Sequence, residues 1–406
     1  MKRRAIQKLP VLRDLVSLKI TVLCLLALFV LTFLGTIHQL NNGLYDAQKK
    51  YFQAFFTLIG GFLPLPGAQL VLWILFVNLL AATIYRFSYK IKRIGILIIH
   101  GGLFLMFIGM FFTQYFAQES VISLLEGEGR NVSSDYFEWE IAFWRDGEQI
   151  RSVAAIDVRD LVNNNSVYIP SYNLKIELVK YFKNAEAFSS RGTDSGIWIN
   201  GSNIDYLEEI RSSKDPQENS PGLLLKIETV DKSVSNILLY ARDINPVLIT
   251  FNGGRVFASL RRKQFVLPVV LTLEDFQAEF HPNSETPTSF ESNVTIETSE
   301  FSRNALISMN NPLRFAGYTF YQASYAIDAT GRETSTFAVV ENRSRLVPYI
   351  GTAVIGIGLL KGGKEVQWSV AGKITIGWFT LPVIAALISM ILLFILSNIF
   401  NLTVSF

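Results

Sequence analysis

The stretch that decides the fold is Ile94–Phe116, with the sequence IGILIIHGGLFLMFIGMFFTQYF. It contains no Asp, Glu, Lys or Arg, and its one histidine, His100, is the seventh residue of the run. An apolar run of roughly 18 or more residues with few charges is long enough to cross a lipid bilayer as a helix. The stretch therefore predicts a membrane-spanning helix with a histidine inside it.

Four further apolar runs lie at residues 20–37, 68–85, 346–360 and 374–396. Half of all residues are apolar and only 17% are charged, below the roughly 25% of a typical soluble domain. The run at 346–360 has only 15 residues, which as a helix cover about 22 Å of a hydrocarbon core about 30 Å thick. We expect about five transmembrane helices, with either a full span or a re-entrant segment at 346–360.

Charge is divided unevenly along the 406-residue chain. Residues 116–345 hold 22 basic and 31 acidic side chains, whereas the remainder holds 15 basic and 3 acidic ones. The basic segments 2–19, 86–93 and 361–373 adjoin apolar runs and belong on the cytoplasmic side by the positive-inside rule. This places the N-terminus in the cytoplasm and residues 117–345 outside, and it explains the basic balance without nucleic acid as a partner.

Residues 117–345 have the pattern of β-strands. Both Asp146-Gly147 and Asn252-Gly253-Gly254 are typical of tight hairpin turns. We expect a large all-β domain of the sandwich or barrel type between the membrane regions 1–116 and 346–406, with loops at 184–221 and 281–300. Apolar and polar residues alternate in four segments: WEIAFW (139–144), NLKIELV (173–179), LLLKIETV (223–230) and VLTLEDFQAEF (270–280).

The first outer loop, 38–67, contains a short apolar and aromatic segment, YFQAFFTLIGGFL (51–63). It is too short to span a bilayer, so we expect it to lie in the membrane interface or to pack on the outer domain. The following PLPG (64–67) breaks the chain before the second span.

His100 is the strongest candidate for chemistry. An ionisable residue inside a span is a functional hypothesis by default, because its burial is costly. Neutral imidazole is a good ligand for iron, copper or zinc, and Gly101 and Gly102 leave room beside it for a flat cofactor or another helix. The structural alternative is a neutral histidine that hydrogen-bonds to a neighbouring helix, and the residues alone leave both open.

Other candidates are weaker. His38 ends the first span and His281 lies in a loop. Asn78, near mid-depth in the second span, is expected to hydrogen-bond between helices rather than to bind a ligand. The aromatic strand GYTFYQASY (317–325) is expected to belong to a sandwich core, the alternative being a platform for a flat ligand or a partner protein. Its candidate contact residues are Tyr318, Phe320, Tyr321, Gln322 and Tyr325.

Several kinds of site are excluded. The single cysteine, Cys24, rules out an internal disulfide and a Cys-x-x-Cys pair. Three distant histidines do not form a metal triad within one chain, and neither a P-loop nor a G-x-S-x-G motif occurs. Gly102 and Gly109 are interpreted as helix-packing residues.

An ordered set of motifs resembles the ResB family of cytochrome c biogenesis proteins, which act in the system II assembly pathway. The order and spacing of these motifs cover roughly residues 15–360. The motifs are SLK (17–19), LGTIHQ (34–39), PLPG (64–67), VNLL (77–80), KRIGILIIH (92–100), NPLRFAGYTFYQASY (311–325) and VPYIG (347–351).

The resemblance implies a bacterial inner-membrane protein whose large domain faces the periplasm. It implies a non-autonomous subunit of a holocytochrome c synthase, or haem lyase, that works with a ResC-type membrane protein. Together they would bring haem b outward and present it to apocytochrome c. His100 occupies the position of the family's intramembrane haem ligand, and the second ligand would come from the partner. His38 stands where a proline is expected, so its part in binding haem is a weaker expectation.

Two features leave the interpretation open. The segment after residue 360 is unlike the family pattern, so the last span is either the start of a ResC-like half or a separate addition. The alternative function is a non-catalytic, membrane-anchored scaffold whose β-domain binds another envelope protein. A small-molecule transporter is disfavoured, because charged residues are nearly absent from the spans and no inverted repeat occurs.

Overall fold

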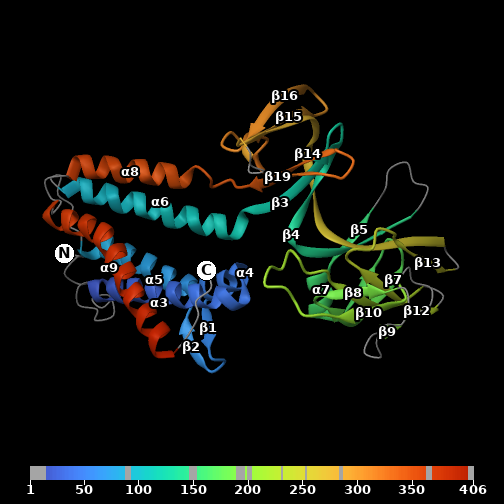
Figure 1. The fold of residues 1–406 in the computed structure, drawn as a ribbon, viewed down its shortest axis with the longest axis horizontal. Helices are drawn as coiled ribbons and strands as arrows, with labels where there is room; N and C mark the ends of the chain where they lie inside the picture. The colour runs from blue at the N-terminus through green and yellow to red at the C-terminus, as the bar shows by residue number, and fades with distance from the viewer. Residues whose placement is uncertain are drawn as a thin grey trace, which may run out of the picture. The chain divides into compact units, whose positions relative to one another are not determined.

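The computed structural model describes residues 15–86, 93–145, 153–188, 197–198, 204–229, 232–251, 254–282, 287–362 and 368–400 (Figure 1). Within these ranges the chain divides into two compact units. One unit comprises Met1–Thr21, Leu75–Phe111 and Leu346–Phe406, and the other comprises Val22–Ile74 and Phe112–Arg345. The boundaries of these units fall inside three of the helices. The division at 116 and 345 expected from composition stays a prediction.

Four helices in the described part of the chain are long and apolar enough to cross a membrane. They are α3 (Leu18–Asn42), α5 (Ala68–Ala81) with the π-helix Ala82–Arg86 that continues it, α6 (Ile94–Phe116) and α9 (Trp368–Phe400). Helix α8 (Val347–Gly362) is apolar but has only 16 residues. The helix expected at each of the five apolar runs is therefore present, and the run at 346–360 is as short as the sequence predicts.

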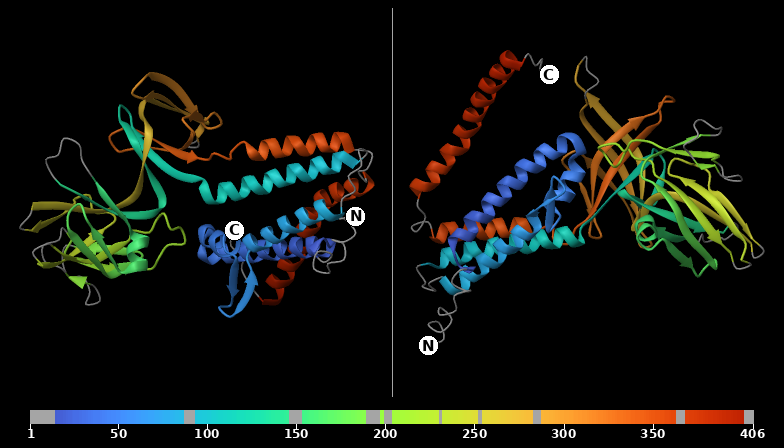
Figure 2. Two further views of the ribbon diagram at one scale, coloured as in Figure 1. Left: turned by 180° about the vertical axis from the view of Figure 1, so that it is seen from behind. Right: turned by 90° about the horizontal axis from the view of Figure 1, so that it is seen from below.

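Helices α6 and α8 pack antiparallel along a seam of glycines (Figures 1 and 2). Gly95 lies against Gly358 and Gly362, Gly102 lies against Gly351, and the last seam residue, Gly109, lies against Val347. The three α6 glycines are seven residues apart, so they fall on one face of the helix and let the two backbones approach closely. The packing role expected for Gly102 and Gly109 is confirmed.

The apolar segment 51–63 does not form a single element. It begins in the π-helix Gln48–Phe52, which follows the short helix α4 (Leu44–Ala47), and continues into a hairpin of β1 (Phe56–Ile59) and β2 (Leu63–Pro66). Gly60 and Gly61 form the turn with positive φ angles, a conformation that glycine adopts without strain. The large apolar side chains of the hairpin are mostly exposed, and their place in a membrane interface stays a prediction.

The region between α6 and α8 is built mainly of antiparallel strands, which confirms its β-rich character. Its largest sheet has ten strands in the order β16-β15-β14-β4-β3-β19-β18-β17, with β13 on β14 and β5 on β4. The strands are β3 (Gln118–Leu125), β4 (Gly129–Trp144), β5 (Ala154–Asp157), β13 (Val247–Phe251), β14 (Gly254–Phe280), β15 (Pro287–Glu297), β16 (Ser302–Ser308), β17 (Leu313–Phe315), β18 (Tyr318–Ile327) and β19 (Glu333–Glu341).

Two smaller sheets complete the region. A four-stranded sheet has the order β12-β11-β7-β6 and a three-stranded sheet the order β8-β10-β9. The helix α7 (Val158–Asn164) precedes β6, and Asp157 caps its first turn by accepting a hydrogen bond from the Arg159 N–H. The strands are β6 (Ser166–Ile169), β7 (Leu174–Phe182), β8 (Ala185–Phe188), β9 (Ile197–Trp198), β10 (Tyr206–Glu209), β11 (Gly222–Glu228) and β12 (Val234–Tyr240).

Two main apolar cores lie at the two ends of β14. One core joins the four-stranded sheet to β4, β13 and the first part of β14, and includes Phe143, Leu225 and Ala258. The other joins the second part of β14 to β3, β15, β18 and β19, and includes Leu271 and Phe320. The first core therefore lies between two sheets. The sandwich or barrel type of the whole domain stays a prediction.

The alternating segments are confirmed as strands, in β4, β7, β11 and β14. Strands β13 and β14 pair antiparallel with Phe251 opposite Gly254, whereas Asn252 and Gly253 themselves lie outside the described residues. The Asp146-Gly147 turn lies outside the described residues. The loops expected at 184–221 and 281–300 were wrong in part, since β8, β10 and β15 lie there. Ser- and Asn-rich composition hid these strands, because edge and half-exposed strands tolerate polar residues on their outer face.

Candidate functional site

His100 lies half-buried in α6 with its ring directed at the end of α5. Its Nδ1 lies 2.8 Å from Thr83 Oγ1, and the Thr83 hydroxyl donates to the Leu79 carbonyl oxygen at 2.8 Å. A threonine hydroxyl has one hydrogen, and since Thr83 donates it to Leu79 we assign the hydrogen between Thr83 and the ring to Nδ1. The tautomer assigned in this way carries its lone pair on Nε2, the atom through which a histidine can bind a metal.

An aromatic cluster continues the α5–α6 contact from His100 along the helix. The Phe76 ring meets the rings of Phe104, Phe107 and Phe111 edge-on, with centroids 5.7, 5.9 and 6.0 Å away. These residues follow His100 at helical spacing, so they lie on the same face of α6. The cluster fixes α5 against α6 and with it the distance between Thr83 and the His100 ring.

The two glycines beside His100 have different surroundings. A Cβ added at Gly102 would lie 2.6 Å from Ile355 Cγ1 and 2.7 Å from the Gly351 carbonyl oxygen, so this residue meets helix α8. A Cβ added at Gly101 would have no atom within 4 Å. Gly102 therefore serves helix packing, whereas Gly101 leaves open space next to the histidine.

Asn78 holds the start of the first span, as its sequence position predicts. Its Nδ2 donates to the carbonyl oxygens of Leu15 and Ser17 at 2.6 and 3.2 Å, and its Oδ1 accepts a hydrogen bond from Thr21 Oγ1 at 2.7 Å. All of its strong hydrogen-bonding groups are thus engaged within the chain, and Asn78 is a structural residue.

Both ring nitrogens of His38 have partners within the chain. Nε2 lies 2.7 Å from Asp46 Oδ2, and Nδ1 lies 3.3 Å from Asn42 Nδ2. Since the Asn42 amide donates, Nδ1 accepts and Nε2–H donates to Asp46. Tyr51 packs edge-on against the ring with its centroid 5.4 Å away. Haem ligation by His38 would require one of these bonds to break, and it stays a prediction.

The remaining polar candidates give no metal site. His281 is exposed in the segment after β14, and Cys24 is buried in α3. Among the residues that the structure describes, no group of three or more His, Cys, Asp and Glu side chains is placed to hold a metal ion.

The aromatic strand β18 is mainly a core strand at Phe320 and Gln322. Phe320 is buried in the second core. The buried Gln322 accepts from Ser292 Oγ at 2.8 Å and donates to Ser335 Oγ at 2.7 Å. The Ser335 and Ser292 hydroxyls lie 2.8 Å apart, so the three side chains form a closed buried network.

The tyrosines of β18 have separate surroundings. Tyr325 packs on Phe276 and Phe290, with ring centroids 5.0 and 5.3 Å away. Tyr318 is half-buried, and burial, followed by the nearby Glu341 carboxylate, raises the pKa of its hydroxyl. Tyr321 alone of the three is exposed. The tyrosines thus form no single flat platform, and their part in partner binding stays a prediction.

Sequence reasoning missed Thr83. It is the polar residue in the run AATIY (81–85), near the end of the second span, where a threonine gives no functional signal by itself. Only the three-dimensional pairing of the ends of α5 and α6 places it against His100.

The comparison with known proteins concerns the β-rich region first. The model of the ResB-like family matches residues 232–367, from β12 through the aromatic strand β18 to the end of α8. The resemblance to the ResB-like family is confirmed. The matched ResB-like region does not include His100, so the role of that residue is a proposal.

A relative extends the ResB-like similarity over more of the chain. Protein NrfI of Wolinella succinogenes is 23% identical over 316 residues, which are 72% of this chain and 29% of that protein. The chain therefore spans less than a third of the length of this relative.

Proposed function

We propose that the chain is a subunit of a haem-delivery and cytochrome c haem-ligation complex in the bacterial inner membrane. The ResB-like match and the similarity to NrfI support the cytochrome c biogenesis part of this proposal. The proposal also includes three more specific parts, which are the transfer of haem b across the membrane, the ResC-type partner and the apocytochrome substrate. The observation that carries them is the geometry at His100.

The surroundings of His100 fit haem as a substrate. The contact between His100 Nδ1 and Thr83 orients the ring, so that Nε2 is the atom proposed to bind iron. The open space at Gly101 allows a flat macrocycle to lie beside the helix, while the glycine seam keeps α8 on another face. One histidine supplies one axial bond, so the second axial ligand comes from the partner membrane protein.

In this proposal the residues of this chain position the haem, and the cysteine thiols come from another protein. Thioether bonds to haem require cysteines, and the single cysteine here is buried in α3. The Cys-x-x-Cys-His motif of the apocytochrome provides them. The β-domain, on the periplasmic side, then holds the apocytochrome or orients the partner, and the N-terminus lies in the cytoplasm.

Reconstitution tests this function. The chain would be produced with a ResC-type partner and a reporter apocytochrome c in a bacterial host without its own cytochrome c assembly proteins. We expect covalent haem on the reporter, seen as a haem-stained band in a denaturing gel, only when both membrane proteins are present. A reporter band that does not depend on this chain would contradict the proposal.

Thr83→Val tests the positioning of His100. Valine keeps the shape of threonine but removes the hydroxyl, so the imidazole loses the partner that fixes its tautomer. Loss of such a supporting bond lowers metal affinity by about tenfold or more. We expect haem titrations followed by the Soret band to show about that loss, and a shift in the haem reduction potential.

The control for this prediction is Thr83→Ser, which keeps the hydroxyl. It is expected to restore both the affinity and the potential. Equal weakening in the valine and serine variants would mean that Thr83 contributes packing and not orientation.

A further inference from the structure

A polar pocket at the end of α3 is not used by the proposed function. Its volume is about 830 Å³, and its walls come from two parts of the chain. One wall is the end of α3 with α4 and the π-helix after it, and the other is the segment from Arg211 to Asn219 with Lys183. The lining residues are Asn41, Asn42, Tyr45, Asp46, Lys49, Lys183, Arg211, Ser212, Ser213, Lys214, Pro216 and Asn219.

The pocket is strongly cationic. Four of its lining side chains are basic, and the one carboxylate, Asp46, is engaged by the His38 Nε2–H at 2.7 Å. Lys183 and Arg211 form no ion pair with any residue in the described ranges. Four basic side chains against one carboxylate leave a net positive charge in the empty pocket, and a bound anion lowers that electrostatic free energy.

The segment that carries these charges is docked on the helix. Lys214 Nζ donates to the Leu40 carbonyl oxygen at 2.8 Å, one of the last carbonyls of α3. The backbone carbonyl of Lys214 approaches Gly43 so closely that an added Cβ would lie 2.1 Å from it. Gly43 has φ +83°, so both the space and the backbone conformation require glycine.

Buried amides make the same segment rigid. Asn184 donates to the Arg211 carbonyl oxygen at 3.0 Å and accepts from the Ser220 N–H at 2.9 Å. Asn219 accepts from the Ser213 N–H at 2.8 Å. Asn184 and Asn219 are buried, so these bonds are shielded from water and hold the basic residues in fixed positions.

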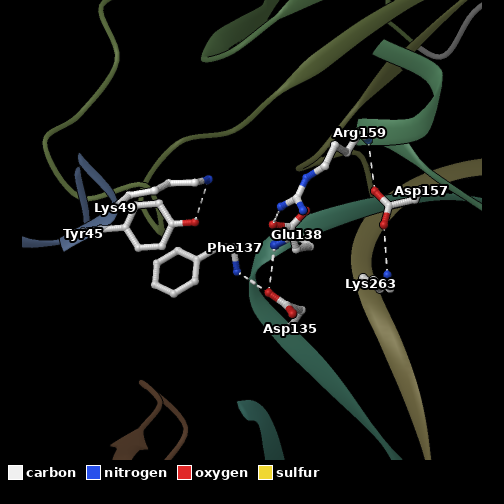
Figure 3. Close-up of polar contacts among 8 residues, drawn as sticks. All are labelled: Tyr45, Lys49, Asp135, Phe137, Glu138, Asp157, Arg159 and Lys263. Carbon is white, nitrogen blue, oxygen red and sulfur yellow. Dashed lines mark hydrogen bonds and ion pairs between the residues drawn. The ribbon is translucent and has the colours of Figure 1, made fainter. Parts of the chain in front are cut away.

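The opposite wall is held by an aromatic stack. The rings of Tyr45 and Phe137 are stacked with centroids 4.2 Å apart, and Lys49 Nζ donates to the Tyr45 hydroxyl at 3.4 Å (Figure 3). The Phe137 N–H in turn donates to Asp135 Oδ1 at 2.7 Å. The pocket is therefore a pre-formed site with basic groups on both walls.

We propose that this pocket binds the phosphate group of an anionic phospholipid. It lies where a membrane-spanning helix ends, which is the level of lipid headgroups. Most of its lining residues are polar or basic, which suits the phosphodiester and the hydroxyls of a lipid headgroup. Leu40 and Leu44 are largely exposed on the neighbouring turns and offer an apolar surface to the acyl chains.

The test uses the purified full chain in detergent with equimolar phosphatidylglycerol and phosphatidylcholine. Lipids that remain bound are counted by native mass spectrometry. We expect the wild type to retain phosphatidylglycerol, and Lys49→Gln/Lys183→Gln/Arg211→Gln to lose that preference by about tenfold, equal to about 1.4 kcal/mol. Lys214 is left unchanged, because it also caps α3.

The matched control is Lys175→Gln/Lys180→Gln/Lys226→Gln, which removes the same charge from three lysines of the four-stranded sheet that each pair with a glutamate. It is expected to keep the lipid preference. Arg211→Gln alone, whose side chain supports no described contact, is expected to weaken it in part, which separates lipid loss from misfolding.

Soluble competitors identify the source of the phosphate. Inorganic phosphate and glycerophosphoglycerol, which have no acyl chains, are expected not to displace the lipid at equal concentration. Displacement by either would overturn the lipid assignment in favour of a soluble phosphate compound. Equal preference in the pocket triple variant and the control triple variant would overturn the site itself.

Discussion

His100→Ala is expected to remove haem from the purified complex of this chain with a ResC-type partner. Alanine has no donor atom for iron, and neither Thr83 nor the phenylalanines along α6 replaces it. The Soret band of the complex should fall to the background level. The protein itself should still fold, because removing a half-buried imidazole ring leaves only a small cavity. The visible spectrum of the complex before and after haem addition measures this.

His281→Ala provides the matched control, since it makes the same chemical change at an exposed histidine. It should leave the Soret band unchanged. Free imidazole added to His100→Ala should restore part of the band by occupying the vacated space. A Soret band that survives His100→Ala at full intensity would show that His100 is a packing residue, and the function would then rest on the β-domain as a scaffold.

Gly102→Val is expected to separate α6 from α8. The new Cβ would lie 2.6 Å from Ile355 Cγ1 and 2.7 Å from the Gly351 carbonyl oxygen, and backbone cannot move aside as a flexible side chain can. Overpacking of this kind costs about 3 kcal/mol. We expect the thermal unfolding midpoint in detergent, followed by size-exclusion chromatography after heating, to fall by several degrees.

Gly101→Val controls for this change one residue away. It alters helix propensity in the same way, but no atom lies within 4 Å of the new Cβ. Its unfolding midpoint should stay near that of the wild type. If the space at Gly101 receives haem, this variant should instead weaken haem binding. Equal midpoints for the two valine variants would contradict the glycine seam.

The elements with strong periodicity were predictable from sequence, and those that depend on distant partners were not. The uninterrupted apolar run of α6 and the alternation in β14 leave little choice of local structure. Strand β8 was missed because it has only four residues, and β15 because polar residues dominate its sequence although it pairs with its neighbours β14 and β16. The hairpin β1–β2 was not predicted, because its apolar and aromatic composition is equally compatible with a helix, a strand or an interfacial loop.

The residues of the candidate site were likewise predictable from sequence only in part. His100 was identifiable alone, because a histidine within an apolar run has few ordinary explanations. Thr83 was not, since a threonine near a helix end is common and only its distance to the ring gives it meaning. The basic pocket was also invisible, because Lys49, Lys183 and Arg211 are far apart in sequence and no spacing rule connects them.

The long strand β14 has a mechanical consequence for the β-rich region. Its 27 residues pair with β4, β13 and β15 and supply side chains to both main cores. The pairing of β14 with β4 runs from Phe257 to Val266 and resumes at Leu271, so the hydrogen-bonded ladder reaches from the first core to the second. A force applied at one core would therefore be transmitted through the backbone of β14 to the other core. Slow amide hydrogen exchange should extend along the paired length of β14 and not stop at a boundary between two modules.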